Sequence, residues 1–284
     1  MPHRPHVRAS VPFALALLLA AGCSAAQEPT TNVGSKVSTP EDIAKDFATV
    51  PCDDKDRLAA VRALYESAGA TASDITMDQH DNVENLVVTK KGASPEKIVI
   101  GAHYDKTSEG CGAIDNWTGQ VALTHLYRTL KDIPLNKTLV FVAFGREEKG
   151  LVGSRAMTKG IDKEQAAGYC AMINIDSLGL GPPQVADNMS SKKLARFTGE
   201  LAKEMEIPFG HASIGRANSD SSSFVAKKIP AVTIHGLNND WSTILHSKHD
   251  QVAKVNSASV YLGYRLALAM IVKLDASACD AYRQ

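Results

Sequence analysis

The chain has 284 residues, of which 44% are hydrophobic and 22% are charged, and its 31 Lys and Arg residues balance 31 Asp and Glu residues. This composition is typical of a globular protein and excludes an intrinsically disordered chain. The net charge of zero excludes a polybasic nucleic-acid-binding protein, because such a protein needs excess positive charge to attract phosphates, so no nucleic-acid partner is expected.

The first segment of the chain predicts export. Arg4 and Arg8 precede an apolar run over Val11–Ala21, which is shorter than the roughly 20 residues needed to span a bilayer. This arrangement is typical of a secretory signal. The run is followed by Gly22-Cys23, which resembles the end of a bacterial lipobox, in which the Cys is lipidated and becomes the new N-terminus.

We therefore expect a signal peptide over residues 1–22, a lipid on Cys23, a tether over residues 23–39 and one folded domain over residues 40–284. The tether is rich in small and polar residues, as flexible linkers are. A plain signal peptide cleaved a few residues later is the alternative. The predicted location is the cell envelope, on its periplasmic or extracellular face, with the membrane contacted only through the lipid anchor.

Four cysteines follow the predicted lipidation site, at Cys52, Cys111, Cys170 and Cys279. An even number of cysteines in an oxidising compartment allows two disulfides, in any of three connectivities. Single structural thiols are the alternative. The chain has no CxxC motif, which argues against a zinc site made of thiolates.

Capping residues and hydrophobic periodicity predict the secondary structure. In chain order, the predicted elements are a helix that begins at Pro40, a helix over Asp54–Ala68, strands over Asn85–Thr89 and Ile98–His103, a helix over Asn116–Lys131, a strand over Thr138–Phe144, a helix over Leu151–Lys159, a strand over Tyr169–Ile175, helices over Ser190–Glu206 and Ser219–Ala226, a strand over Ala231–Ile234 and a helix over Asn256–Ala276. The alternation predicts an α/β fold with a sheet covered on both faces. In such folds the active site lies beyond the carboxyl ends of the strands.

The ends of two predicted strands carry ionisable side chains. His103 and Asp105 lie two residues apart, so both point to the same face of an extended chain. Asp105 can therefore accept the second ring N–H of His103 and fix its tautomer. Glu147 and Glu148 follow the next strand, and two adjacent acids at such a position are costly unless a cation lies nearby. A structural His and a solvated acidic turn are the alternatives.

Three further segments add to this set. Asp115 precedes a predicted helix, where an N-cap is the plain alternative. Asp176 ends another strand, and His246 and His249 lie in a loop near the C-terminus. Strand ends and loops thus bring His, Asp, Glu, Asp and His to one edge of one sheet. Such a set without a thiolate suits zinc with open coordination positions.

The order and spacing of these motifs resemble those of the M28 zinc metallopeptidases, from Pro40 to Ala276. The matching motifs are Gly101–Asp105, Gly112–Asn116, Phe144–Ser154, Asn174–Asp176, Ser219–Asp220 and His246–Asp250. The double-Glu motif with its Gly-Leu-x-Gly-Ser continuation is the most specific. The resemblance implies a three-layer α/β/α sandwich with a mixed, mostly parallel central sheet, and a co-catalytic pair of zinc ions in each chain.

The resemblance also implies a role for each matching residue. The five implied metal ligands are His103 and Asp176 at one zinc, Glu148 and His246 at the other, and Asp115 as the bridge between them. Glu147 would be the general base, and Asp105 would orient His103. His246 rather than His249 matches the ligand, because it precedes Ser-x-x-Asp.

Two positions depart from the family pattern. Ser221 stands where the family often has His after Ser-Asp, which concerns the substrate side rather than metal binding. Trp117 stands where a small residue is usual, and it either narrows the pocket or packs in the core.

The implied reaction is that of an exopeptidase, an aminopeptidase that hydrolyses N-terminal residues from peptides with a free N-terminus. The zinc pair activates a water, and Glu147 takes its proton and passes it to the leaving amine. A glutaminyl-peptide cyclotransferase-like enzyme, typically with one zinc, is an alternative on the same fold. A carboxypeptidase, in which Arg146 or Arg216 holds a substrate carboxylate, is another. The third alternative is a non-catalytic envelope binding protein, although every ligand and the base are present. No oligomeric state is predicted.

Overall fold

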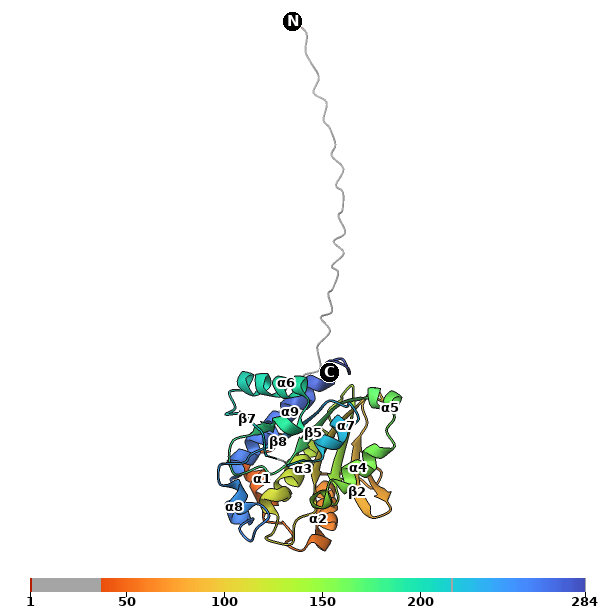
Figure 1. Ribbon diagram of the computed structural model, residues 1–284. Helices are drawn as coiled ribbons and strands as arrows, with labels where there is room; N and C mark the ends of the chain where they lie inside the picture. The colour runs from red at the N-terminus through yellow and green to blue at the C-terminus, as the bar shows by residue number, and fades with distance from the viewer. Residues whose placement is uncertain (2–36, 216, 284) are drawn as a thin grey trace. The chain divides into compact units, whose positions relative to one another are not determined.

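The computed structural model describes Met1 and residues 37–215 and 217–283, and the structural statements below concern these residues. The chain divides into two compact units, Met1–Asn32 and Val33–Gln284. The predicted signal peptide, Cys23 and nearly all of the predicted tether lie outside the described residues. Every helix and strand described here belongs to the second unit (Figure 1).

One eight-stranded sheet runs through the second unit, with the strand order β1-β2-β4-β3-β5-β8-β6-β7. Its strands are β1 (Ile75–His80), β2 (Val83–Lys90), β3 (Lys97–His103), β4 (Thr138–Phe144), β5 (Tyr169–Ile175), β6 (Gln184–Ala186), β7 (Gly210–Ala212) and β8 (Ala231–His235). The central strands β4, β3, β5 and β8 are parallel to one another. Pairing is antiparallel between β1 and β2, between β2 and β4, and between β6 and β8. The sheet is therefore mixed, and the carboxyl ends of its four central strands meet at one edge.

Helices cover both faces of this sheet and complete three layers (Figure 1). One face packs against α1 (Pro40–Phe47), α2 (Asp54–Ser67), α3 (Thr118–Leu130), α6 (Lys192–Glu204) and α9 (Ser257–Ala276). The other face packs against α4 (Val152–Lys159), α5 (Lys163–Ala167) and α7 (Ser221–Ala226). A short helix, α8 (Trp241–Ile244), lies in the loop between β8 and α9.

Alternate residues of the central strands contribute to two separate hydrophobic cores. In β3, Ile98 and Ile100 belong to the larger core with α3 and α9, whereas Val99 belongs to the smaller core with Phe224 of α7. Strands buried on both faces have this nearly continuous apolar sequence. Among the described residues, α9 is the one helix long and apolar enough to cross a membrane. Its residues Val260, Leu266, Ile271 and others are buried in the larger core, so α9 is here a core helix.

The predicted fold class is confirmed, and every predicted helix and strand is present with ends within two residues of the prediction. Thr39 forms the expected cap of α1, where its side chain accepts a hydrogen bond from the backbone N–H of Asp42. The prediction missed β1, β6, β7, α5 and α8. The strands β6 and β7 have three residues each, too few to show an alternating pattern.

The disulfides join Cys52 to Cys111 and Cys170 to Cys279, which resolves the three possible connectivities. The first bond ties the segment before α2 to the loop that leads to Asp115. The second ties the amino end of β5 to the segment after α9. Both bonds agree with an oxidising compartment.

Candidate metal centre

The carboxyl ends of neighbouring parallel strands place a first group of ligand atoms together. His103 ends β3, and Asp176 follows β5, the strand next to it in the sheet. The Nε2 atom of His103 lies 3.1 Å from Asp115 Oδ1 and 3.6 Å from Asp176 Oδ1. The side chain of His103 is 2% exposed and that of Asp176 is 16% exposed. These three residues therefore form a compact triad that could hold a metal ion.

A second triad lies on the other side of Asp115. The Nε2 atom of His246, in the loop after α8, lies 2.9 Å from Asp115 Oδ2 and 3.3 Å from Glu148 Oε2. The two carboxylate oxygens of Asp115 thus face different histidines. This is the arrangement that a bridging carboxylate between two metal ions requires. His249 is exposed and belongs to neither triad.

The adjacent acids after β4 occupy a turn held by Asp105. The Asp105 carboxylate accepts hydrogen bonds from the backbone N–H groups of Glu147 at 2.9 Å and Glu148 at 3.2 Å. The sequence prediction differs here in one detail. His103 Nδ1 lies 3.1 Å from the backbone carbonyl oxygen of Asp105 and 3.7 Å from its carboxylate. The carboxylate is committed to the turn, so the carbonyl of the same residue orients the imidazole.

The loop that carries Asp115 is fixed by contacts that sequence reasoning missed. The buried carboxylate of Asp250 accepts hydrogen bonds from the backbone N–H groups of Ile114 at 2.7 Å and Asp115 at 3.1 Å. The buried guanidinium of Arg57 donates to the backbone carbonyls of Cys111 and Gly112. The N-cap position of α3 is Trp117, and the two carboxylate oxygens of Asp115 face histidines instead of the helix, so the alternative of an N-cap is wrong.

Burial and crowded acids perturb the pKa values of the centre. Burial raises the pKa of Glu147 well above its ordinary value, and the nearby carboxylates of Asp220 and Asp176 raise it further. Burial raises the pKa of Glu148, which hydrogen bonding to His246 opposes. Hydrogen bonds to Asp115 and Glu148 raise the pKa of His246 to about 10. The pKa shifts therefore have two origins, which are burial and the close packing of carboxylates around two imidazoles.

The residues present fit a pair of divalent cations. The donor set is imidazole and carboxylate, which zinc accepts. Glu148 Oε1 is buried and has no hydrogen-bond partner among the described residues. A buried carboxylate oxygen without a partner is costly unless a cation compensates it. The two triads share Asp115, and His103, Glu147 and Glu148 form a third, overlapping group.

The centre opens into a pocket with largely apolar walls. Residues from several loops and strand ends line it, among them Met189, Ile214, Leu237, Trp241 and Leu245. His235, at the end of β8, also lines the pocket and was not singled out from the sequence. His235 is the last residue of an apolar run, and that run predicts a buried strand without pointing to a functional residue at its end. Its position beside the strand that ends in Asp176 was the available signal.

The two departures from the family pattern have structural explanations. Trp117 is 1% exposed, donates from Nε1 to the carbonyl of Asp46 and packs under Arg57, so it lies in the core rather than in the pocket. Ser221 is buried. Its hydroxyl donates to the backbone carbonyl of Met189 and is hydrogen-bonded to the hydroxyl of Thr233. Both of these partners line the pocket, so Ser221 supports the pocket wall.

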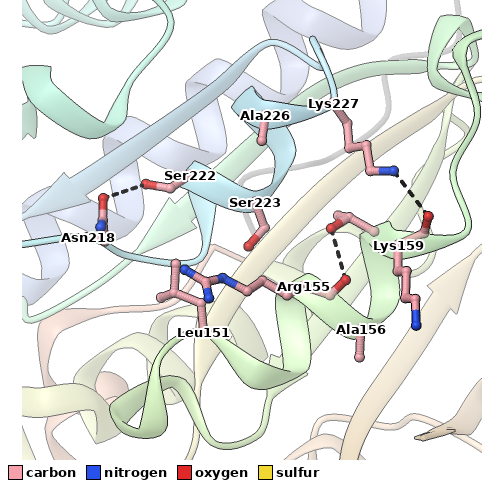
Figure 2. Close-up of a pocket in the computed structure, with 10 residues that line it drawn as sticks. Leu151, Arg155, Ala156, Lys159, Asn218, Ser222, Ser223, Ala226 and Lys227 are labelled. Carbon is pink, nitrogen blue, oxygen red and sulfur yellow. Dashed lines mark hydrogen bonds between the residues drawn. The ribbon is translucent and has the colours of Figure 1, made fainter.

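A second hollow lies between α4 and α7 (Figure 2). Its rim carries Arg155, Lys159 and Lys227, and Lys227 donates to the carbonyl of Lys159. The described residues that line it include no His, Asp or Glu. Within the part of the chain that the structure describes, Asn218 is the one residue that lines both this hollow and the pocket of the centre.

Comparison with protein families and curated sequences gives relatives for this arrangement. The family model described as Peptidase family M28 matches residues 85–271. The Arthroderma otae protein named Probable leucine aminopeptidase is 28% identical over 218 residues, which cover 67% of this chain and 58% of that protein. The Mycobacterium tuberculosis protein named Probable lipoprotein aminopeptidase LpqL is 31% identical over 123 residues, which cover 42% of this chain and 25% of that protein. The matches thus span little more than half of the first relative and a quarter of the second.

Solved structures share the fold. The LapA aminopeptidase of Legionella pneumophila superposes with a TM-score of 0.73 at 18% identity, covering 93% of this chain and 81% of that one. BSAP, a zinc aminopeptidase from Bacillus subtilis, gives 0.60 at 20% identity, covering 71% and 53%. A glutaminyl cyclase from an Acidobacteriales bacterium gives 0.71 at 16% identity, covering 90% and 99%. At these identities the likeness concerns the fold alone.

Proposed function

Since the chain belongs to peptidase family M28, we propose that it is a zinc-dependent aminopeptidase that hydrolyses the N-terminal residue from peptides with a free N-terminus. One observation carries the proposal. Two ligand triads share Asp115, with Glu147 beside them, at the mouth of an apolar pocket. Aminopeptidases among the relatives and the structural neighbours support the same class of reaction.

Two zinc ions would be held by five side chains, namely His103 and Asp176 on one side, Glu148 and His246 on the other, and Asp115 between them. When bound, the zinc pair supplies an activated water and a Lewis acid for the peptide carbonyl. A zinc aminopeptidase among the structural neighbours supports the metal, and the two triads support the number of ions.

The chain's own residues then handle the proton. Glu147 takes the proton of the attacking water and delivers it to the leaving amine, as a general base and then a general acid. The hydrogen bond from its backbone N–H to Asp105 fixes the turn from which its side chain projects. Asp105 also accepts the ring N–H of His103 through its carbonyl, so one residue orients both the base and a ligand.

The test is a kinetic screen over aminoacyl amides with the purified mature protein. We expect hydrolysis that is lost after dialysis against a strong chelator and restored by Zn²⁺. Full hydrolysis by protein shown by metal analysis to hold no zinc would overturn the proposal.

Glutaminyl-peptide cyclisation is the second candidate function. The favouring observation is the likeness to the glutaminyl cyclase, which extends over 90% of this chain. The second triad favours hydrolysis instead, since it provides a complete second site. Assaying a Gln-peptide for loss of its free amine without release of glutamine separates the two reactions.

We further propose that the chain is exported and anchored through a lipid on Cys23, with the signal peptide and tether at the boundaries expected from the sequence. The two disulfides and the relative named as a lipoprotein aminopeptidase support this. Radiolabelled palmitate is expected to enter the wild-type protein and not the Cys23→Ala variant. Equal labelling of both would contradict the anchor.

A further inference from the structure

His235 is a buried histidine beside the candidate centre. A hydrogen bond from a neighbouring residue determines which of its two ring nitrogens carries the proton. It ends β8, the strand paired with β5, and its side chain lines the same pocket as the two triads. The residue is 2% exposed. Its Nδ1 atom accepts a hydrogen bond from the backbone N–H of Leu237 at 3.3 Å. An accepting Nδ1 carries no proton, so the proton of the neutral ring is on Nε2.

The Nε2–H group has no partner among the described residues. A buried donor without an acceptor destabilises the protein, because it has lost its hydrogen bonds with water. The nearby walls include Leu237, Trp241 and Leu245 of an apolar cluster, and the Asp176 carboxylate acts on the ring through its charge without a hydrogen bond to Nε2. Unpaired buried polar groups are rare in folded proteins and call for an explanation. A ligand of the pocket is the explanation that its position suggests.

We propose that His235 determines specificity: its Nε2–H binds an uncharged hydrogen-bond acceptor on the first side chain of the substrate. The substrate class is then peptides whose N-terminal residue carries a side-chain amide, Asn or Gln, in preference to the isosteric Leu or Met. This rests on the proposed aminopeptidase function, in which the first side chain of the substrate enters the pocket beside the centre.

The ring chemistry selects an uncharged acceptor. Nδ1 is occupied by Leu237, so the ring has no free acceptor for the ammonium of a Lys substrate. Burial lowers the pKa of His235 to about 4, which leaves the ring neutral at pH 7 and without a charge to attract a carboxylate. A neutral amide oxygen among apolar walls satisfies the donor and keeps the rest of the side chain in contact with Trp241 and Leu245. Sites built around such a donor discriminate strongly, because the wrong substrate leaves the donor unpaired.

The experiment compares matched substrates in matched variants. His235→Phe and His235→Leu remove the donor, and His235→Gln retains an N–H donor. Each is assayed with Asn-amide against Leu-amide and with Gln-amide against Met-amide, after zinc content and melting temperature have been recorded. We expect the wild-type kcat/KM to favour an amide side chain over its isostere, and the ratio to fall about tenfold or more in the Phe and Leu variants. His235→Gln is expected to keep most of the ratio.

An unchanged ratio, or an equal loss for both members of each pair, would overturn the proposal, since a merely structural histidine affects all substrates alike. Binding of free asparagine and free leucine, measured by calorimetry on the same proteins, gives a readout that needs no turnover. If no amide is hydrolysed but the binding ratio still depends on the donor, the proposed reaction fails and the role of His235 stands. If amides are hydrolysed and neither ratio depends on the donor, the role of His235 fails alone.

Discussion

The two halves of the candidate centre are built from different parts of the fold. His103 and Asp176 stand at the ends of β3 and β5, which are hydrogen-bonded neighbours in the sheet, and their side chains are 2% and 16% exposed. His246 stands in a loop, its side chain is 57% exposed, and its backbone has a left-handed φ of 56°. Asp115 is the one residue common to both triads.

This difference predicts unequal affinity for metal. Ligands on adjacent strands are held at a spacing that the sheet sets, so little order has to be created when a metal binds. A ligand on an exposed loop must be ordered, and a left-handed non-Gly residue stores strain. We therefore expect the half with His103 to bind zinc more tightly than the half with His246.

The largest expected effect is the loss of turnover in a Glu147 variant. It tests whether Glu147 acts in proton transfer and not as a ligand of either half of the centre. Glu147→Gln removes the proposed general base and leaves all five proposed ligands in place, so kcat should fall about 10²- to 10⁴-fold while both proposed zinc ions stay bound. Kinetics on an aminoacyl amide and metal analysis of the same sample measure this. The matched control is Glu200→Gln on the exposed side of α6. Near wild-type turnover by Glu147→Gln would remove it from the reaction.

An intermediate effect is expected from Asp250, which supports the ligand that the halves share. Asp250→Asn replaces one of the two acceptor oxygens by an NH₂ donor, so one of the backbone N–H groups of Ile114 and Asp115 loses its acceptor. Loss of such support typically lowers metal affinity or activity about 10- to 100-fold, and we expect both metal sites to weaken. Asp280→Asn, on the exposed C-terminal segment, is the control. Weakening of one site alone would show that Asp115 is not shared.

The smallest expected effect on activity comes from removing a disulfide, and it should differ between the two disulfides. Replacing Cys52 and Cys111 by Ala releases the loop that leads to Asp115, so activity should fall several-fold together with stability. Replacing Cys170 and Cys279 changes the amino end of β5, opposite the strand ends that carry the centre. This replacement should lower stability without lowering activity. Each loss of stability should be about 2–4 kcal/mol, measured by urea unfolding. Equal activity of the two double variants would contradict the difference.

The predictable part of the site is the part that follows from strand ends. His103 and Asp176 come directly after an apolar run, Glu147 and Glu148 follow one after a short turn, and parallel strands bring such ends together. The order of the motifs was enough to add Asp115 and His246 by resemblance.

Other features depend on distances that the linear sequence does not contain. The support from Asp250 joins residues separated by 135 and 136 positions. The Asp105 carboxylate accepts a backbone N–H from the turn after β4, and the sequence does not show that this turn passes beside Asp105. The interest of His235 depends on two features of the fold. The backbone N–H of Leu237 donates to its Nδ1 atom, and residues from several loops line the pocket beside it. The pairing of four cysteines likewise required the fold.

The most direct test of the unequal, bridged centre is zinc titration of chelator-stripped protein by calorimetry, on the wild type and on His246→Ala. The wild type should bind two zinc ions with distinct affinities, and His246→Ala should keep the tighter site and lose the weaker one. Binding of a single zinc by the wild type, or loss of the tighter site in His246→Ala, would contradict this account.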